Sequence, residues 1–337
     1  MAVRVAINGF GRIGRNILRA IIESGRTDIE VVAVNDLGPV ETNAHLLRFD
    51  SVHGRFPHEV KVSGDTISAG SGQRFKVTAV RNPAELPHKD MGVDIVLECT
   101  GIFTARDKAA AHLQAGAKKI IVSAPSDGAD YTLVMGVNEA GLGKDHIVIS
   151  NGSCTTNCLA PVAKVLHELA GIKHGFMTTI HSYTGDQPTL DTLHKDLYRA
   201  RGAALNSIPT STGAAKAIGL VIPELKGKLD GSSIRVPTPN VSVIDLKVVT
   251  NRKTSIEEVN EAFKAAAASG PLKGILAITD QPNVSHDFNH DPHSATFHLD
   301  QTKVIDGEFV RVLAWYDNEW GFSNRMNDAT VALAATL

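Results

Sequence analysis

A chain of 337 residues with 43% hydrophobic and 21% charged residues has the composition of an ordinary globular protein, and its length suits two domains. The formal net charge of -2 argues against the basic field of a nucleic-acid-binding protein and the acidic excess of a disordered chain. Three cysteines cannot build a disulfide framework, and no apolar run approaches the roughly 20 residues of a membrane span. The chain opens on a strand pattern rather than a signal peptide, so we expect a cytoplasmic protein with no membrane or nucleic-acid partner.

The first predicted elements are a buried strand over residues 3–7, a glycine-rich turn and a helix with one apolar face. Gly9, Gly11 and Gly14 have the G-x-G-x-x-G spacing that lets backbone approach a pyrophosphate. A second strand over residues 29–34 is followed by Asp36, where a carboxylate can bind ribose hydroxyls and repel a 2′-phosphate. We therefore predict a site for NAD rather than NADP; a plain strand–turn–helix corner is the alternative.

The remaining elements predict two kinds of sheet. Strands alternate with a helix in the first half, which is typical of a doubly wound, mostly parallel sheet; they cover residues 94–99, 119–123 and 146–150, with the helix at about 105–115. After Lys173 the strands are longer and alternate in polarity, which favours a mainly antiparallel sheet; they cover residues 175–180, 241–249, 296–304 and 308–316, with helices at 256–268 and 326–337. The expected fold class is α/β, with a Rossmann-type domain followed by an α+β catalytic domain.

The segment Ser150–Cys158 places a thiol between a Gly/Ser turn and an apolar, helix-spaced run. Cys154 would lie in the first helical turn, where the helix dipole favours a thiolate nucleophile; a buried structural cysteine is the alternative. We read Cys158 as structural. His181 ends a predicted strand and is a candidate base, although a surface or core histidine would look the same.

Charged residues in the second half suggest one further contact. Arg235 stands alone between apolar residues and is a candidate clamp for a phosphate or carboxylate, whereas Lys195, Arg199 and Arg201 are interpreted as a solvated face. The run 287–293 holds residues able to bind metal, but it lacks the spacing of a metal site and is interpreted as a polar loop. We expect no metal.

Six segments carry more specific motifs: Asn8–Arg15, Asp50–Phe56, Ser153–Pro161, Pro209–Lys216, Arg235–Asn240 and Trp315–Gly321. With them the chain resembles, essentially end to end, the phosphorylating glyceraldehyde-3-phosphate dehydrogenases. The resemblance implies NAD-dependent oxidative phosphorylation of D-glyceraldehyde 3-phosphate to 1,3-bisphosphoglycerate, in glycolysis or gluconeogenesis, through a cysteine thiohemiacetal and thioester. It also implies an NAD-binding domain over residues 1–153, a catalytic domain over 154–319 and a C-terminal helix, at about 320–337, that returns to the first domain.

The resemblance assigns roles by position. Cys154 matches the catalytic nucleophile and His181 its base. The matched cofactor-binding residues are Gly9, Gly11, Arg12, Ile13, Gly14, Asp36, Arg81, Thr100, Ser123 and Asn318. Substrate phosphate would bind Thr184 and Arg235, and inorganic phosphate would bind Ser153, Thr155, Thr212 and Gly213. The resemblance further implies a homotetramer in which residues 183–206 pack near a neighbouring subunit's cofactor.

Some positions depart from the family pattern and leave alternatives open. Thr192 and Leu193 replace a Leu-Pro pair typical of strictly NAD-dependent members, which weakens the expected exclusion of NADP, and Phe322 stands where a Tyr is common. The loop 287–294 resembles that of erythrose-4-phosphate dehydrogenase, a related enzyme, although the phosphate loop 212–216 is that of the phosphorylating family. A non-catalytic, NAD-binding regulatory protein of the same fold is the second alternative.

Overall fold

The computed structural model describes residues 2–70 and 72–337, and the chain divides into two compact units. Unit 1 comprises the chain up to Leu133, Glu139–Gly152 and Ser323–Leu337, whereas unit 2 comprises Val134–Asn138 and Ser153–Phe322. The main passage from unit 1 to unit 2 falls one residue before the division expected from the sequence. The short piece Val134–Asn138 joins unit 2, which no sequence pattern indicated.

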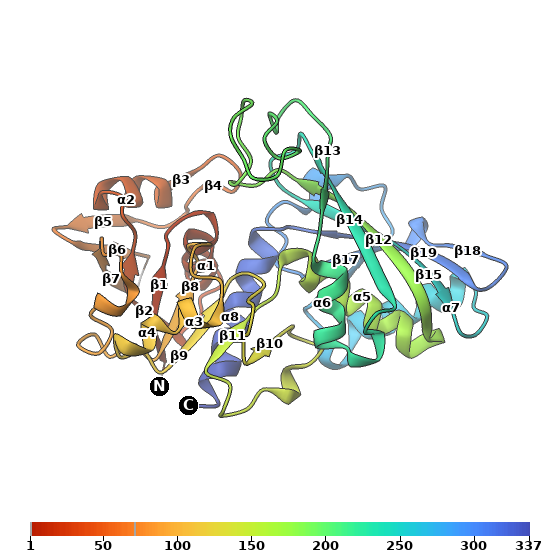
Figure 1. Cartoon of the computed structure of the whole chain (residues 1–337), viewed down its shortest axis with the longest axis horizontal. Coiled ribbons are helices and arrows are strands. Elements are labelled where there is room, and N and C mark those ends of the chain that lie inside the picture. The colour runs from red at the N-terminus through yellow and green to blue at the C-terminus, as the bar shows by residue number, and fades with distance from the viewer. Residues whose placement is uncertain (1, 71) are drawn as a thin grey trace. The chain divides into compact units, whose positions relative to one another are not determined.

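Unit 1 is built on a nine-stranded sheet of order β10-β11-β9-β8-β1-β2-β7-β6-β5 (Figure 1). Neighbouring strands are parallel from β10 to β7, and β7, β6 and β5 form an antiparallel meander. The central strands β8 and β9 are buried at every residue, as expected for parallel strands covered on both faces. The strands are β1 Val3–Asn8, β2 Ile29–Asn35, β5 Val60–Ser63, β6 Thr66–Ala69, β7 Gln73–Thr78, β8 Ile95–Glu98, β9 Lys119–Val122, β10 Tyr131–Thr132 and β11 Val148–Ser150; β3 Phe49–Asp50 and β4 Gly54–Arg55 pair separately.

The helices of unit 1 are α1 Arg12–Glu23, α2 Val40–Arg48, α3 Arg106–Ala109 and α4 Ala111–Gln114, together with most of α8 Trp320–Ala334. The last helix lies beside α1, where Asn327 Nδ2 donates to Ile17 O at 3.2 Å, and it begins earlier than the sequence pattern indicated. The prediction of one helix at about 105–115 was wrong. Ala110, with ψ near -14°, ends α3, and Leu113 N bonds to Ala110 O three residues back, a tight turn that an apolar pattern cannot distinguish from a regular helix.

Unit 2 is built on an eight-stranded sheet with the path β13-β14-β12-β15-β19-β17-β16, with β18 also pairing β19. The pairs β12–β14 and β16–β17 are parallel and the others are antiparallel, so the sheet is mixed but mainly antiparallel. Helices α5, α6 and α7 bury their apolar residues against it in one core. The elements are α5 Cys154–Ala170, β12 Ile172–Ser182, β13 Ile208–Ser211, α6 Ala214–Val221, β14 Leu229–Val236, β15 Ser242–Thr250, α7 Ile256–Ala268, β16 Leu276–Thr279, β17 Ala295–His298, β18 Lys303–Ile305 and β19 Phe309–Tyr316.

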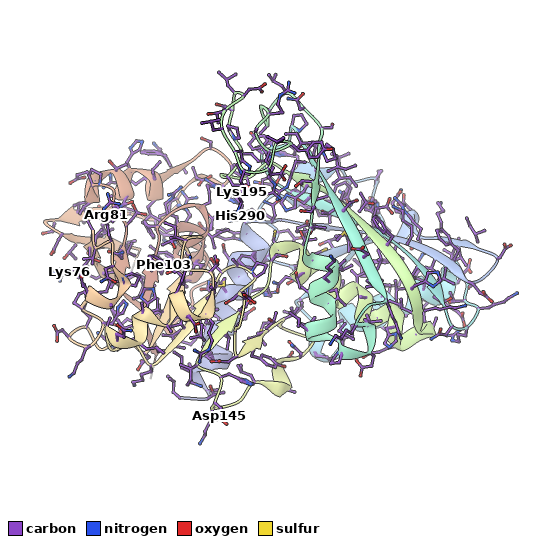
Figure 2. The ribbon with its side chains drawn as sticks, viewed as in Figure 1. Lys76, Arg81, Phe103, Asp145, Lys195 and His290 are labelled. Carbon is purple, nitrogen blue, oxygen red and sulfur yellow. The ribbon has the colours of Figure 1, made fainter. Side chains whose placement is uncertain are left out.

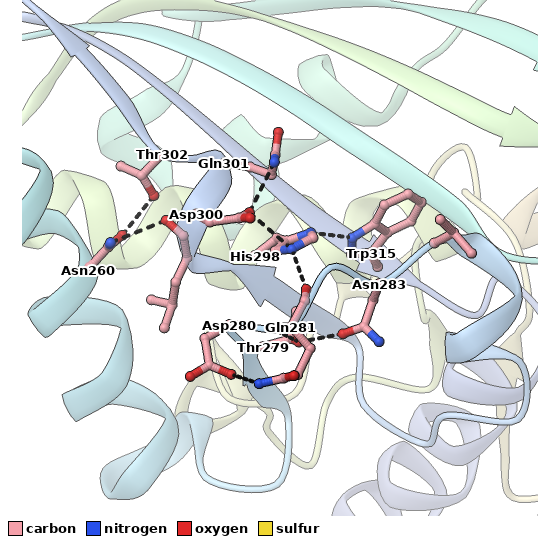
Figure 3. A network of polar contacts seen from close by, with 12 residues as sticks. Asn260, Thr279, Asp280, Gln281, Asn283, His298, Asp300, Gln301, Thr302 and Trp315 are labelled. Atoms are coloured by element: carbon pink, nitrogen blue, oxygen red, sulfur yellow. Dashed lines mark hydrogen bonds and ion pairs between the residues drawn. The ribbon is translucent and has the colours of Figure 1, made fainter.

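The strand expected over residues 296–304 is interrupted. A 3-10 turn, Leu299–Gln301, separates β17 from β18, although both strands pair with β19. Polar contacts hold this turn (Figure 3): Asn260 of α7 donates to Leu299 O at 3.2 Å and accepts from Thr302 Oγ1 at 2.7 Å. These contacts come from a distant part of the chain, so the local alternation of polarity could not reveal them.

The predicted fold class is confirmed: unit 1 has the mostly parallel sheet of a Rossmann-type domain, and unit 2 has the mainly antiparallel sheet of an α+β domain. The helix expected over residues 256–268 is present with those bounds, and the Oγ of Ser255 caps it by accepting from Glu258 N at 3.2 Å. Among the residues that the structure describes, no helix is long and apolar enough to cross a membrane.

Candidate active site

A cleft of about 380 Å³ opens at the carboxyl ends of the parallel strands of unit 1. This is the edge at which open α/β sheets bind their ligands. The predicted cofactor residues Gly9, Gly11, Asp36, Arg81 and Thr100 line it; Arg81 and Phe103, which also lines it, are labelled in Figure 2. The other lining residues are Asn8, Asn35, Leu37, Val80, Cys99 and Ile102.

Each glycine of the G-x-G-x-x-G turn has a distinct steric role. Gly9 has φ of 92°, and a Cβ there would lie 2.7 Å from Thr100 N. A Cβ on Gly14 would lie 2.1 Å from Gly9 O, whereas one on Gly11 would meet nothing within 4 Å. Gly9 and Gly14 are therefore needed to form the turn itself. Gly11, the uncapped start of α1, leaves backbone open to a ligand such as a pyrophosphate, so the cleft fits a dinucleotide.

The side chains around this turn are fixed by hydrogen bonds. Asp36 accepts from Phe10 N at 2.9 Å and from Gly38 N at 3.0 Å, which holds its carboxylate at the end of β2 beside the turn. Arg12, in the first turn of α1, forms an ion pair with Asp50. Burial opposes ionisation of Asp50, but the bonds from Arg12 and from backbone N–H groups outweigh it and lower its pKa to about 2.

The remaining predicted cofactor residues do not line the cleft. Ile13 and Gly14 lie in α1, and Ser123 follows β9, with its backbone N–H bonded to Glu98 O at 3.0 Å. Asn318 belongs to unit 2, where its Oδ1 accepts from Ser182 and Ser242 hydroxyls, each at 2.9 Å. These bonds fix which way its amide points.

In unit 2, Cys154 is the first residue of α5, as expected. Ser153 caps this helix, with its Oγ accepting from Thr156 N at 3.0 Å. Gly152, with φ of 63°, provides the left-handed turn that leads from β11 into the helix. The strand–turn–helix connection therefore presents the thiol at a helix N-terminus.

Cys154 and His181 lie within reach of one another, although 27 residues separate them. Sγ of Cys154 is 3.5 Å from Nε2 of His181. Nδ1 of His181 is 2.7 Å from Ser182 O, and a carbonyl oxygen can only accept, so Nδ1 carries the ring proton. In the neutral ring the lone pair of Nε2 is therefore the one that meets the thiol.

Burial shifts the pKa values of both groups of this pair. Burial raises the pKa of the Cys154 thiol, although the Arg235 guanidinium and hydrogen bonds at Thr155 act in the opposite direction. Burial and the same guanidinium lower the pKa of His181 to about 3. Desolvation thus acts against the thiolate that the helix start favours, while the neutral imidazole of His181 can accept the thiol proton.

Arg235 lies next to His181, because β12 and β14 pair in parallel with these residues in register. Its Nη1 donates to Thr184 Oγ1 at 2.9 Å and to Ser182 O at 3.1 Å. The two residues expected to bind substrate phosphate are therefore in direct contact, beside the Cys154–His181 pair.

Arg199 was wrongly interpreted as part of a solvated face. Its Nη1 donates to Asp186 Oδ2 at 2.6 Å and its Nε to Thr210 Oγ1 at 3.1 Å, and Asp186 in turn accepts from Thr184 at 2.5 Å. Burial would raise the pKa of Asp186, but Thr184 and Arg199 keep it below the ordinary value. Arg199 thus adds a second guanidinium to the group around Arg235. The sequence alone could not distinguish Arg199 from the nearby charged residues Lys195 and Arg201.

Tyr316 connects the helix that carries Cys154 to the strand that carries His181. Its buried hydroxyl lies 2.9 Å from both Thr155 Oγ1 and Thr179 Oγ1, and its ring meets the His181 ring edge-on. Because Thr179 donates its own proton to Val243 O, Tyr316 must donate to Thr179 and accept from Thr155. The Tyr316 hydroxyl therefore joins α5 to β12 through two hydrogen bonds.

Thr212 and Gly213 lie where β13 leads into α6. Thr212 Oγ1 accepts from Ala214 N at 3.2 Å, and Gly213, the N-cap of α6, has no side chain to cap the helix. Among the residues that the structure describes, no hydrogen bond joins Thr212 or Gly213 to Cys154 or Arg235. Their assignment to inorganic phosphate therefore stays a prediction.

Two other polar clusters of unit 2 lie outside this site. His298 is held by Trp315 Nε1 at 3.0 Å and by Gln281 O at 2.9 Å (Figure 3), and the ring of His290 stacks on Trp320. In the loop expected to be polar, Asp291 pairs with His293 at 2.6 Å. Over residues 2–70 and 72–337, no group of three or more His, Cys, Asp or Glu side chains could hold a metal ion. Cys158 is fully buried.

Comparison with known proteins shows which protein family the chain matches. Residues 3–106 match the family model "Glyceraldehyde 3-phosphate dehydrogenase, NAD binding domain", and residues 153–318 match the corresponding C-terminal domain. The chain belongs to the glyceraldehyde-3-phosphate dehydrogenase family. Glyceraldehyde-3-phosphate dehydrogenase of Xanthobacter flavus is 77% identical over 333 residues, covering 99% of both chains. That of Cereibacter sphaeroides is 72% identical over 337 residues and covers both chains completely, and that of Geobacillus stearothermophilus is 57% identical over 336 residues, covering 99% of both.

The match confirms the family predicted from the sequence motifs, and it confirms NAD as the cofactor of the N-terminal domain. Like the other members, the chain is an oxidoreductase with the two-domain sequence of this dehydrogenase family. The alternative of an erythrose-4-phosphate dehydrogenase is not favoured, because the relatives from several bacteria carry the glyceraldehyde-3-phosphate name along their whole length.

Proposed function

We propose that this chain oxidises D-glyceraldehyde 3-phosphate with NAD and inorganic phosphate to 1,3-bisphosphoglycerate, as in glycolysis and gluconeogenesis. The observation that carries the proposal is the contact of 3.5 Å between Cys154 Sγ and the proton-accepting Nε2 of His181, with the Arg235–Thr184 pair beside it. A nucleophile, its base and an anion clamp are the groups that acyl transfer from a phosphorylated aldehyde requires.

Oxidation would begin with attack of Cys154 Sγ on the aldehyde carbon. As the C–S bond forms, the thiol proton passes to Nε2 of His181 and then to the former carbonyl oxygen, giving a thiohemiacetal. Nε2 next accepts the proton of that hydroxyl while a hydride leaves the carbon, and a thioester remains on Cys154. Bound NAD supplies the hydride acceptor. The backbone N–H of Cys154 and the protonated Nε2 would stabilise the oxyanion.

Phosphorolysis would complete the reaction. An oxygen of inorganic phosphate attacks the thioester carbon, the C–S bond breaks, and the His181 imidazolium returns its proton to the departing sulfur. Arg235 and Thr184 would hold the substrate's phosphate, while Ser153, the backbone at Thr155, Thr212 and Gly213 would bind the attacking anion. A guanidinium suits this role because it offers paired donors to phosphate oxygens.

We also propose that residues 1–153, with the helix at about 320–337, form the cofactor domain and that residues 154–319 form the catalytic domain. In the cofactor domain, the G-x-G-x-x-G turn, Asp36, Arg81 and Thr100 would bind the nucleotide. Asn318 would orient the carboxamide of the nicotinamide. Asp36 presents a carboxylate where a 2′-phosphate would need a cation, which supports NAD over NADP.

A homotetramer is the assembly that we propose. The segment ahead of β13, green in Figure 1, leaves several leucines largely exposed; Leu193 is 99% exposed, and the others are Leu190, Leu197 and Leu205. Phe176, Ile234 and Phe309 also lie at least one-third exposed on the strands of unit 2. Apolar surface of this kind is typical of protein–protein contacts. We expect the assembly to act in the cytoplasm, consistent with the free state of Cys99, Cys154 and Cys158.

An initial-rate assay tests the function directly. The purified chain is given glyceraldehyde 3-phosphate or erythrose 4-phosphate, each with NAD or NADP and with or without inorganic phosphate. We expect turnover with the three-carbon substrate and NAD to depend on phosphate, and Cys154→Ser to abolish it. Faster, phosphate-independent turnover of the four-carbon substrate would instead identify an erythrose-4-phosphate dehydrogenase. No turnover of either, with slow alkylation of Cys154, would favour the regulatory alternative.

A further inference from the structure

A buried carboxylate lies behind the nucleotide cleft of unit 1. Glu98, the last residue of β8, is 1% exposed and is not among the residues that line the cleft. Its Oε1 accepts from the backbone N–H of Thr100 at 2.8 Å and from the Thr100 hydroxyl. Its Oε2 accepts from Asn8 Nδ2 at 2.6 Å and from His112 Nε2 at 3.1 Å. Burying a carboxylate is costly unless hydrogen bonds replace its water, and here four donors do so.

Two buried histidines, neither of which lines the cleft, support this carboxylate. A carboxylate only accepts, so Nε2 of His112 carries a proton; Nδ1 of His112 lies 3.0 Å from His88 Nε2. His112 and His88 are 0% and 2% exposed, and burial together with His112 lowers the pKa of His88 to about 4. The chain His88–His112–Glu98 is thus a continuous set of hydrogen bonds inside unit 1, and the proposed mechanism does not use it.

The other donors to Glu98 belong to the cleft itself. Asn8 and Thr100 both line it, at the ends of β1 and just after β8. The Thr100 hydroxyl also accepts from Ile102 N at 3.0 Å, which fixes the turn through Gly101. Asn8 Oδ1 accepts from Asn35 Nδ2 at 2.8 Å, so the polar row continues to the end of β2. Glu98 therefore determines how two strand ends present their polar groups to a ligand.

We propose that Glu98, supported by His112, is a positioning residue for NAD binding: it holds Asn8 and Thr100 in the orientation that the nucleotide requires, without touching the nucleotide. The inference rests on the proposed function, since it concerns the same cofactor. Glu98→Gln keeps the size of the side chain but places an amide N–H₂ against groups that are themselves donors. The substitution must therefore turn Asn8, Thr100 or His112 away.

The test measures the Kd of the full-length apo protein for NAD, by quenching of intrinsic fluorescence and by calorimetry, beside kcat at saturating NAD. We expect Glu98→Gln to weaken NAD binding about tenfold or more, with kcat within about threefold of wild type. His112→Leu should also weaken it, whereas His112→Gln, of similar size, retains a donor for Glu98 and an acceptor for His88 and should bind NAD nearly as wild type does.

A matched control separates positioning from general loss of stability. Lys119 of β9 is buried in the same sheet and donates to Lys144 O at 3.0 Å and to Thr336 Oγ1 at 2.6 Å. Lys119→Met should lower the thermal midpoint without changing the Kd for NAD. If Glu98→Gln binds NAD with a Kd within about twofold of wild type, the inference is overturned while the proposed function stands. If Glu98→Gln does not fold, the same result in His112→Leu overturns it. A wild-type chain that binds no NAD would overturn the proposed function and the inference with it.

Discussion

Replacing His181 with asparagine should convert a base-assisted reaction into one that depends on free thiolate. In the wild type, Nε2 lies 3.5 Å from Sγ and is unprotonated at neutral pH, because its pKa is lowered to about 3. The asparagine amide is too weak a base to take the thiol proton, so the thiol must ionise into solvent first. Burial keeps the pKa of Cys154 above its ordinary value, and even an ordinary thiol, with a pKa of about 8.5, is only about 3% thiolate at pH 7.

The need to ionise the thiol first therefore lowers the reaction rate of the variant by a factor of about 30 or more at pH 7. Loss of the donor to the oxyanion brings the total loss of rate to about 10²–10⁴. Single-turnover formation of NADH, followed by stopped flow from pH 6.5 to 8.5, measures this step. The variant's rate should rise about tenfold per pH unit, while the wild-type rate stays nearly flat. The Kd for NAD serves as the control and should not change. A loss of less than tenfold, or a variant whose rate ignores pH, would refute the assignment of His181 as the base.

Two further substitutions test the surroundings of this pair, and a third tests the buried His88 of unit 1. Tyr316→Phe removes the hydroxyl that Thr155 donates to, so we expect a loss of about 1–2 kcal/mol in the free energy of unfolding and slower acylation; denaturant titration with unchanged stability would contradict this. Arg235→Leu should raise KM for glyceraldehyde 3-phosphate more than tenfold while sparing unphosphorylated glyceraldehyde, and equal effects on both substrates would exclude a phosphate clamp. His88 has its pKa lowered from 6.5 to about 4, so its contribution to stability is present above pH 6.5 and is lost as the pH falls towards 4. In His88→Phe the acid-induced loss of unfolding free energy between pH 7 and pH 4 should shrink by about 3 kcal/mol, as measured by denaturant titration at each pH.

The glycine turn and the helix that starts at Cys154 could be predicted because each depends on neighbouring residues. Gly9 is required by its own φ of 92° and Gly14 by the close approach of Gly9 O, and the Oγ of Ser153 caps its helix by accepting from the backbone N–H of Thr156, three residues along the chain. Two secondary-structure predictions were wrong because contacts outside the local pattern decided the backbone conformation. Residues 105–115 form two short helices, and residues 296–304 turn aside because Asn260, in a distant helix, holds the backbone at Leu299.

The sequence by itself determined the family, the fold class, the cofactor-binding turn and the position of the thiol at the start of α5. Only the tertiary structure decided the contacts within the site: the approach of Cys154 Sγ to His181 Nε2 at 3.5 Å, the burial that lowers the pKa of His181, and the hydrogen bond between Thr155 and Tyr316. It also brought Arg199 to Asp186, and Glu98 to His112. Spacing along the chain fixes turns and helix starts, whereas burial and hydrogen-bond partners are set by segments far apart in sequence, and these determine which protons can move.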